Sequence, residues 1–230
     1  MAQTTQLPTF ATMIISQTEE NYLKAIYLLA QAEGGKIPNL RIANQLNINP
    51  ATVTEMLKKL AEKKWIDYTR TDGAILTTEG QLIALQIVRK HRLWETFLVQ
   101  SLNFTWDEVH EVAEQLEHIQ SQKLLDQLSI FLGHPNFDPH GDPIPGPDGA
   151  MPKTKAVLLS ECLPGEVRQF VAVANHSPAF LQYLSKVGFK IQETVEIEDI
   201  HDFDHSMNVT LNGTRKTVFS AEVAKGLLVV

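Results

Sequence analysis

The sequence predicts an α+β protein built from several domains. Its 230 residues are enough for one large domain or for two to three small ones. Apolar residues recur at helical spacing from residue 18 to about residue 132, and a segment dense in Pro and Gly follows. Short β-like runs separated by turn signals occupy the rest of the chain. This order predicts helical domains followed by a small β domain.

The composition is that of an ordinary globular protein, with 43% hydrophobic and 20% charged residues. No apolar run approaches the roughly 20 residues that span a bilayer. Residues 1–17 lack Lys and Arg, so they are not expected to be a signal peptide and are predicted to be a flexible arm. Cys162 is the single cysteine, which excludes an internal disulfide and fits a reducing, cytoplasmic location.

The net charge of −7 is spread unevenly along the chain. Residues 18–75 hold eight Lys and Arg against seven Asp and Glu, whereas residues 76–230 hold 12 against 20. The front of the chain is therefore nearly neutral and the acidity lies behind it. This balance allows nucleic-acid binding only through a local patch.

Residues 18–77 are predicted to form three helices and a β-hairpin. The expected helices are at 18–31, 39–46 and 50–63, and the expected strands are at 65–70 and 74–77. Thr18 is expected to cap the first helix, and Asn49 followed by Pro50 suits the start of the third. Asp72-Gly73 is a hairpin turn signal. Three helices followed by a hairpin are the order of a winged helix-turn-helix.

Two more helices and a break are predicted next. A long helix is expected from about Thr78 to Leu102, and the capping box Thr105–Glu108 is expected to start another that reaches about Leu132. Residues 133–154 contain six Pro and four Gly, a density that excludes regular structure and predicts an interdomain linker.

The last third of the chain is predicted to be a small β-barrel of SH3-like size. The β-like runs are 155–159, 167–174, 194–199, 209–211 and 217–219. Asn212-Gly213 is a hairpin turn signal. One helix interrupts the strands, with Ser177 as its expected cap, Pro178 in its first turn and Gly188 at its end.

Imidazoles and carboxylates gather on single helix faces between residues 91 and 118. His110, Glu114, Glu117 and His118 would fall within an arc of about 100° on one helix. His91-x-x-x-Glu95 places two more such groups one helical turn apart. Groups of this kind can share a divalent cation, although acids and histidines on a helix face are more often only solvated.

Four motifs in order resemble the DtxR/MntR family of iron- and manganese-dependent transcriptional repressors. They are Thr18-Glu-Glu-Asn-Tyr-Leu-Lys-Ala-Ile-Tyr27, Arg89-Lys-His-Arg-Leu-Trp-Glu95, Val109-His-Glu-Val-Ala-Glu-Gln-Leu-Glu-His118 and Gly141-Asp-Pro-Ile-Pro-Gly146. The resemblance covers about residues 18–150, and the remainder looks like the optional SH3-like, FeoA-type domain of the family.

The resemblance implies a division into five parts. These are an arm at 1–17, a winged helix-turn-helix DNA-binding domain at 18–77, a helical dimerisation and metal-binding domain at 78–132, a linker at 133–154 and an SH3-like domain at 155–230. It implies a homodimer, formed through helices 78–132, that binds a palindromic operator and represses metal-uptake genes when loaded with Mn²⁺ or Fe²⁺. It does not imply an enzyme.

The resemblance also implies two metal sites. The primary site would use Asn21, Glu114, Glu117 and His118. The ancillary site would use His91, Glu95 and His110, with His176 as a possible further ligand from the C-terminal domain.

The residue types leave Mn²⁺ and Fe²⁺ both open. Iron-type members of the family carry Cys at the position of Glu114, and a carboxylate there favours a hard ion such as Mn²⁺. Manganese-type members carry acids at the positions of Asn21 and Lys24. An Asn ligates only through its carbonyl oxygen, and a protonated Lys does not ligate.

The third helix is the expected DNA-reading helix, because recognition helices present their N-terminal residues to base edges. The residues expected to face DNA there are Asn49, Pro50, Ala51, Thr52, Thr54 and Glu55. Lys58, Lys59, Lys63, Lys64 and, on the wing, Arg70 are expected to reach phosphates. An ordinary solvated helix end is the alternative for these basic residues.

Two other functions fit parts of the pattern. One is a winged-helix protein whose metal is purely structural. The other is a metal-dependent hydrolase, although the chain lacks His-Glu-x-x-His and a Gly-rich phosphate loop. The acidic, His-containing run 201–205 lies in an expected β-edge segment, where solvated charge is the simpler interpretation.

Overall fold

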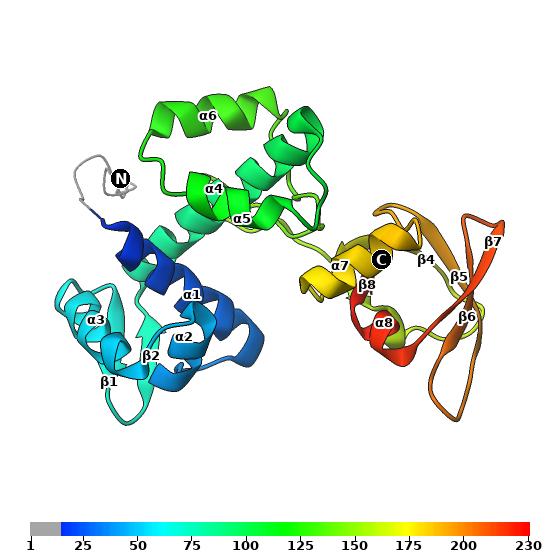
Figure 1. The fold of residues 1–230 in the computed structure, drawn as a ribbon, viewed down its shortest axis with the longest axis horizontal. Coiled ribbons are helices and arrows are strands. Elements are labelled where there is room, and N and C mark those ends of the chain that lie inside the picture. Colours follow the sequence, from blue (N-terminus) through cyan, green and yellow to red (C-terminus); the bar gives the residue numbers. More distant parts are fainter. Residues whose placement is uncertain (1–14) are drawn as a thin grey trace, which may run out of the picture. The chain divides into compact units, whose positions relative to one another are not determined.

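The computed structural model describes residues 15–230, and the chain divides into two compact units, Met1–Ile87 and Val88–Val230 (Figure 1). Most of the predicted arm, residues 1–14, lies outside the described residues. No helix among residues 15–230 is long and apolar enough to cross a membrane.

The first unit is a winged helix-turn-helix, as predicted. Its elements are α1 (Gln17–Glu33), α2 (Asn39–Leu46), α3 (Pro50–Glu62), β1 (Ile66–Thr69) and β2 (Gly73–Leu76). The strands pair antiparallel from Ile66 opposite Leu76 to Thr69 opposite Gly73. Asn49 caps α3 as expected, because its side chain accepts the Ala51 N–H at 2.9 Å.

The start of α1 differs from the prediction. Ser16, not Thr18, is the cap: its hydroxyl accepts the Glu19 N–H at 3.3 Å, and the Glu19 carboxylate accepts the Ser16 N–H at 3.0 Å. This reciprocal pair is a capping box. The cap therefore lies two residues earlier than expected, at a residue whose capping box satisfies two backbone N–H groups.

Glu19 also ties α1 to α3. Its carboxylate lies 2.6 Å from Lys63 Nζ and 3.0 Å from Lys59 Nζ, and its side chain is only 2% exposed. Burial alone would raise the pKa of Glu19, but the hydrogen bonds from Lys63, from the Ser16 backbone and from Lys59 lower it to about 2. The apolar core of this unit, the winged head, includes Leu23, Ile26, Ile42, Val53, Leu57 and Leu60.

The helices that follow agree with the prediction in part. Helix α4 spans Thr78–Leu102 as expected. The single helix expected after it is divided into two helices, α5 (Val109–Leu116) and α6 (Gln122–Phe131). The single-helix prediction was wrong for two local reasons. Only one bond of the expected capping box forms, from the Thr105 N–H to the Glu108 carboxylate at 3.2 Å, and the helix starts later. Ser121 then accepts the Leu124 N–H and starts α6.

The Pro- and Gly-rich segment lacks helices, as predicted, yet it is packed against α4. Arg89 donates to the carbonyl of Pro145 at 2.7 Å, and Arg92 donates to the carbonyl of Pro143 at 2.6 Å. Ile144 is buried in a cluster that includes Leu93. These contacts hold the segment in place rather than leaving it as a free spacer.

The C-terminal part is a six-stranded antiparallel sheet in the order β3-β8-β4-β5-β6-β7. The strands are β3 (Val157–Leu158), β4 (Val167–Val173), β5 (Thr194–Ile200), β6 (Met207–Leu211), β7 (Arg215–Phe219) and β8 (Leu227–Val229). Helix α7 (Pro178–Lys186) occupies the predicted position, whereas the single turn η2 (Leu159–Glu161), α8 (Ala221–Lys225) and β8 were not predicted. Helix α8 and strand β8 are five and three residues long, too short for a periodic pattern.

We predict that Glu19→Gln lowers the opening free energy of the winged head by about 2 kcal/mol at pH 7, because the charged pairs with Lys59 and Lys63 are lost. The depressed pKa makes this stabilisation fully present above pH 4.5 and lost as the pH falls towards 2. Hydrogen exchange of the α1 amides measures the difference.

Glu62→Gln is the matched control, because Glu62 lies exposed at the end of α3. An equal loss in both variants, or a Glu19→Gln effect that persists undiminished near pH 3, would contradict the role of this buried cluster.

Candidate metal centre

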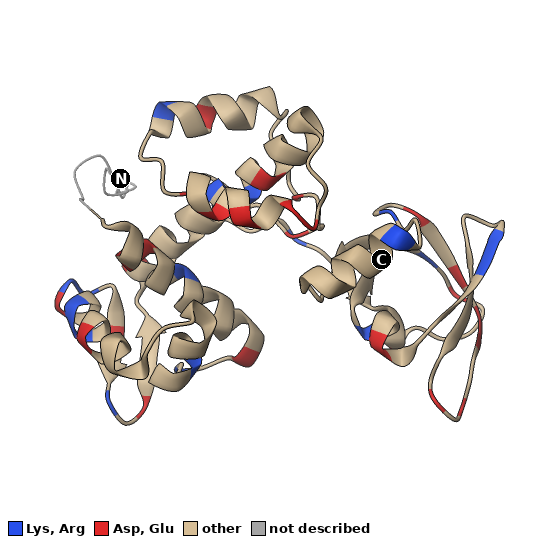
Figure 2. Cartoon of the chain, in the orientation of Figure 1, with Lys and Arg blue, Asp and Glu red and all other residues tan. Residues whose placement is uncertain are grey.

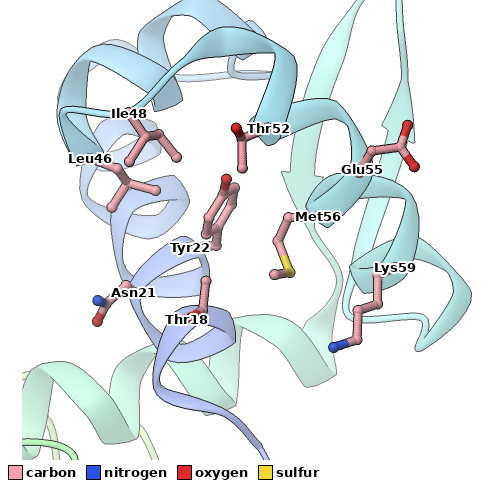
Figure 3. Close-up of a pocket in the computed structure, with 9 residues that line it drawn as sticks. All are labelled: Thr18, Asn21, Tyr22, Leu46, Ile48, Thr52, Glu55, Met56 and Lys59. Carbon is pink, nitrogen blue, oxygen red and sulfur yellow. The ribbon is translucent and has the colours of Figure 1, made fainter.

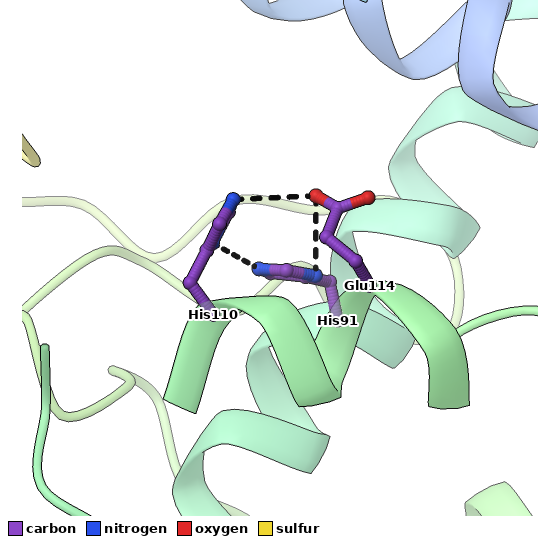
Figure 4. Close-up of side chains that lie close together, drawn as sticks. All are labelled: His91, His110 and Glu114. Carbon is purple, nitrogen blue, oxygen red and sulfur yellow. Dashed lines mark hydrogen bonds and ion pairs between the residues drawn. The ribbon is translucent and has the colours of Figure 1, made fainter. Parts of the chain in front are cut away.

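Helices α4 and α5 supply the side chains of the first ligand cluster. His91 comes from α4, and His110 and Glu114 lie one turn apart on α5. One ligand atom from each lies within 4.8 Å of the others, and Figure 4 shows the three groups facing one another. The His110 Nε2 to Glu114 Oε1 distance is 3.4 Å, and the His91 Nδ1 to Glu114 Oε1 distance is 3.9 Å.

His91 is at the middle of the cluster, with a side chain only 7% exposed. Its Nδ1 lies 2.7 Å from Glu117 Oε2, and its Nε2 lies 3.0 Å from Glu95 Oε1 and 3.1 Å from His110 Nδ1. An imidazole donates to carboxylates from both nitrogens only when it carries two protons. A cation bound there would place positive charge among these carboxylates.

Glu117 and His118 follow directly at the end of α5. Glu117 is the C-cap residue and is fully buried, and its Oε1 lies 4.0 Å from His118 Nε2. Residues expected in two different sites therefore meet here: His91, expected in the ancillary site, contacts Glu114 and Glu117, expected in the primary one.

A second cluster joins the first through Glu95. Ligand atoms of Glu95, Asp138 and His140 lie within 4.8 Å of one another, and all three residues are buried. His140 Nδ1 is 3.7 Å from Glu95 Oε2 and 4.0 Å from Asp138 Oδ1. Asp138 Oδ2 is buried without a hydrogen-bond partner among residues 15–230, with Arg92 Nε 3.6 Å away.

Asp138 and His140 were not among the sequence-predicted ligands. They lie in the Pro- and Gly-rich segment, where no periodicity places a side chain relative to a helix. The signal available in the sequence was the spacing Asp-x-His-x-Asp at residues 138–142, which overlaps the start of the family motif at Gly141.

The electrostatics of the second cluster are those of closely packed, buried charges. Burial alone would raise the pKa of Glu95, but contacts with the imidazoles of His110, His140 and His91 hold it far below its usual range. Burial and the carboxylates of Asp142 and Glu95 raise the pKa of Asp138 to about 8. Although burial opposes it, the contacts with Glu95 raise the pKa of His140 to about 9.

Asn21, the remaining predicted ligand, lies on α1 in the first unit. Its Oδ1 is buried and has no hydrogen-bond partner among the described residues, so this oxygen is chemically suited to accept a cation. Asn21 also lines a cavity of about 410 Å³ between α1 and α3, where Tyr22 and Met56 lie side by side (Figure 3). Lys24, on the same helix, is buried.

The C-terminal candidates lie outside both clusters. His176 contacts Asp142, with Nε2 3.6 Å from Oδ2, and its ring centroid is 5.7 Å from that of His140. In the run 201–205, His201 contacts the Asn208 amide and Asp204 accepts from Ser206. Neither His176 nor this run belongs to a group of ligand atoms within 4.8 Å in the described part of the chain.

The predicted DNA-reading residues lie mostly at the surface of the winged head. The exposed ones are Asn49, Pro50, Ala51, Thr52, Glu55, Lys58, Lys59 and Arg70. Thr54 is half-buried, and its hydroxyl accepts from Asn39 Nδ2 at 3.1 Å.

The basic residues on α3 have partners within the head. Lys58 pairs with Glu55 at 2.9 Å, and Lys59 pairs with Glu19. Figure 2 shows both signs of charge on α3 and a concentration of acids on α5. Phosphate contacts by Lys58 or Lys59 would therefore compete with these ion pairs.

The donor set suits a hard divalent cation. Carboxylate oxygens and imidazole nitrogens are the ligand atoms of both clusters, and the only cysteine, Cys162, is buried in the C-terminal core. Oxygen-rich sites with some imidazole favour ions such as Mn²⁺ and Fe²⁺ over thiolate-seeking ones. The residues present therefore fit such a metal.

Three protein-family models match the chain in succession. They are the iron dependent repressor N-terminal DNA-binding domain (residues 14–74), the iron dependent repressor metal binding and dimerisation domain (77–146) and the FeoA domain (157–230).

Individual relatives agree with these matches. The iron-dependent repressor IdeR of Mycobacterium leprae is 34% identical over 151 residues, which are 63% of this chain and 65% of that protein. The diphtheria toxin repressor of Corynebacterium diphtheriae is 30% identical over 160 residues, 66% of this chain and 70% of that protein. The chain thus spans less than two thirds of the length of the IdeR relatives it matches, down to 56% for those of Mycobacterium tuberculosis.

A solved structure matches over nearly its whole length. A manganese-dependent transcriptional repressor in complex with manganese is 32% identical, with a TM-score of 0.84 over 92% of this chain and 99% of that one.

A winged DNA-binding head and a His- and carboxylate-lined centre define the class of metal-responsive transcriptional regulators. The chain belongs to the DtxR/MntR family of iron- and manganese-dependent transcriptional repressors, and it carries a C-terminal FeoA domain. This family consists of repressors rather than enzymes, so the hydrolase alternative is set aside.

Proposed function

We propose that this protein is a homodimeric repressor whose DNA binding is activated by Mn²⁺ or Fe²⁺. The observation that carries the proposal is that one helix both follows the DNA-binding wing and supplies metal-ligating side chains. Helix α4 begins at Thr78, directly after the wing. It supplies His91 to the first ligand cluster and Glu95 to the second. An ion held there is bonded to the helix that continues into the DNA-binding head.

The first metal position uses His91, His110 and Glu114, with Glu117 and His118 beside it. The second uses Glu95, Asp138 and His140. Asn21 is the proposed contribution of α1 to the first position, through its orphaned carbonyl oxygen. His176 is proposed as a neighbour of the second position through Asp142, rather than as a principal ligand.

The residues of the two clusters would hold the metal, and its binding would order the protein for DNA binding. A ligand shifts an equilibrium only by its difference in affinity between the two states, so the metal must prefer the DNA-binding arrangement. Linkage requires that DNA tighten metal binding by the same factor. In the dimer, formed through helices 78–132, two heads face a palindromic operator, and the residues at the N-terminus of α3 read its bases. The regulated genes are proposed to be those for metal uptake.

We predict that Glu117→Ala weakens Mn²⁺ binding at the first position by about a hundredfold, because it removes a buried carboxylate in contact with His91. Equilibrium dialysis measures the affinity. Glu111→Ala is the matched control, since Glu111 lies on the exposed face of the same helix. Equal Mn²⁺ binding by the wild type and Glu117→Ala would show that the metal lies elsewhere.

We predict that loading the second position releases a proton, because the raised pKa of His140, about 9, keeps its ring protonated at neutral pH. The Mn²⁺ affinity of this position should therefore rise with pH between about 6 and 8. Calorimetry at one pH in two buffers of different ionisation enthalpy tests the release. Identical apparent enthalpies in the two buffers would contradict it.

We predict that Thr52→Glu abolishes DNA binding in the presence of Mn²⁺, because the new charge at the N-terminus of α3 is repelled by phosphates. The probe is a set of duplexes selected from a random pool by the Mn²⁺-loaded wild type. Metal binding should be unchanged. Gln31→Glu, which adds the same charge at the exposed end of α1, is the control, and undiminished DNA affinity of Thr52→Glu would refute the placement.

A further inference from the structure

Trp106, in the turn before α5, contacts the second ligand cluster and the C-terminal domain at once. Its main-chain carbonyl accepts a hydrogen bond from His140 Nε2 at 2.7 Å. Its indole N–H donates to the Ser185 hydroxyl on α7 at 2.6 Å. Its ring stacks on that of His140, with centroids 6.2 Å apart and planes 6° from parallel. The ring also packs against the hydrophobic core of the C-terminal domain.

The carbonyl of Trp106 determines which nitrogen of His140 is available to a metal. Because Nε2 keeps its proton in the bond to this carbonyl, Nδ1 is the nitrogen left to ligate. Nδ1 is the atom that faces Glu95 and Asp138, at 3.7 and 4.0 Å. A carbonyl bonded to the far nitrogen of a ligating imidazole is a common way of fixing the orientation of the ring.

Strand β4 of the C-terminal domain also contacts the main chain at His140 and Gly141. The Val173 N–H of β4 donates to the His140 carbonyl at 2.9 Å. Gly141 has φ +85°, and a Cβ there would lie 1.9 Å from the Val171 carbonyl oxygen and 2.5 Å from Ala172 Cα. Glycine is therefore required for β4 to approach this closely. His140 is thus fixed between Trp106 and β4.

We propose that Trp106 is a positioning residue for the second metal position and that it couples metal occupancy there to docking of the C-terminal domain. This inference rests on the proposed second metal position. The indole–Ser185 bond anchors the turn to α7, and the Trp106 carbonyl transmits that anchoring to His140. By linkage, a metal that fixes His140 also stabilises the docked domain.

The test compares variants that break the same bond from its two sides. Trp106→Phe removes the indole donor and keeps an aromatic ring, and Ser185→Ala removes the acceptor. Each variant should lower the Mn²⁺ affinity of the second position by about tenfold and leave that of the first position unchanged, as expected for loss of an outer-shell partner. The double variant should be no weaker than either single variant. Ser185→Thr, which keeps the hydroxyl, should retain wild-type affinity.

Trp94→Phe is the control for removing an indole, because Trp94 packs against apolar residues of α4, α5, α6 and the Pro- and Gly-rich segment rather than against the C-terminal domain. Hydrogen exchange gives a second readout: Mn²⁺ should slow exchange of the Val173 amide in the wild type, and less so in Trp106→Phe.

The outcomes separate the two proposals. A wild type that binds only one Mn²⁺ per chain overturns the second metal position and the role of Trp106 with it. A wild type that binds two, with unchanged affinities in Trp106→Phe and Ser185→Ala, overturns the role of Trp106 alone. If Ser185→Thr lowered the Mn²⁺ affinity as much as Ser185→Ala does, the indole–Ser185 hydrogen bond would not be the cause of the loss.

Discussion

The packing of Glu95, Glu114 and Glu117 around the imidazole of His91 is the constraint on which this part of the molecule depends. Buried or half-buried carboxylates at such distances are costly unless positive charge lies among them. In the metal-free protein, the protonated ring of His140 supplies that charge in the second cluster. A divalent ion bound there would supply the same positive charge, which is the physical basis of the proposed response to metal.

The ligand clusters are connected to the rest of the molecule through helix α4 and the Pro- and Gly-rich segment. Helix α4 extends from the wing into the cluster, and Arg89 and Arg92 on the same helix hold the Pro- and Gly-rich segment that carries Asp138 and His140. That segment in turn contacts β4 of the C-terminal domain. The FeoA domain is thus in direct contact with the backbone of a candidate ligand, which gives it a means of influencing the centre without supplying a ligand itself.

The helices and the ligand pairs on them were predictable from the sequence, because they depend on residues close together in the chain. Asn49-Pro50 marks the start of α3, and spacings of four residues place His91 with Glu95 and His110 with Glu114 on helix faces. The features that were missed depend on distant contacts. The positions of Asp138 and His140 are set by bonds from α4 and β4, which no periodicity reports. The break between α5 and α6 lies at a Ser cap inside an otherwise continuous apolar pattern.

The most direct test of the metal centre is an anomalous difference map from crystals loaded with Mn²⁺ and measured at the manganese absorption edge. The account predicts one peak bounded by ligand atoms of His91, His110 and Glu114, and a second bounded by those of Glu95, Asp138 and His140. Peaks confined to another location, such as the exposed run 201–205, with neither cluster occupied, would contradict it.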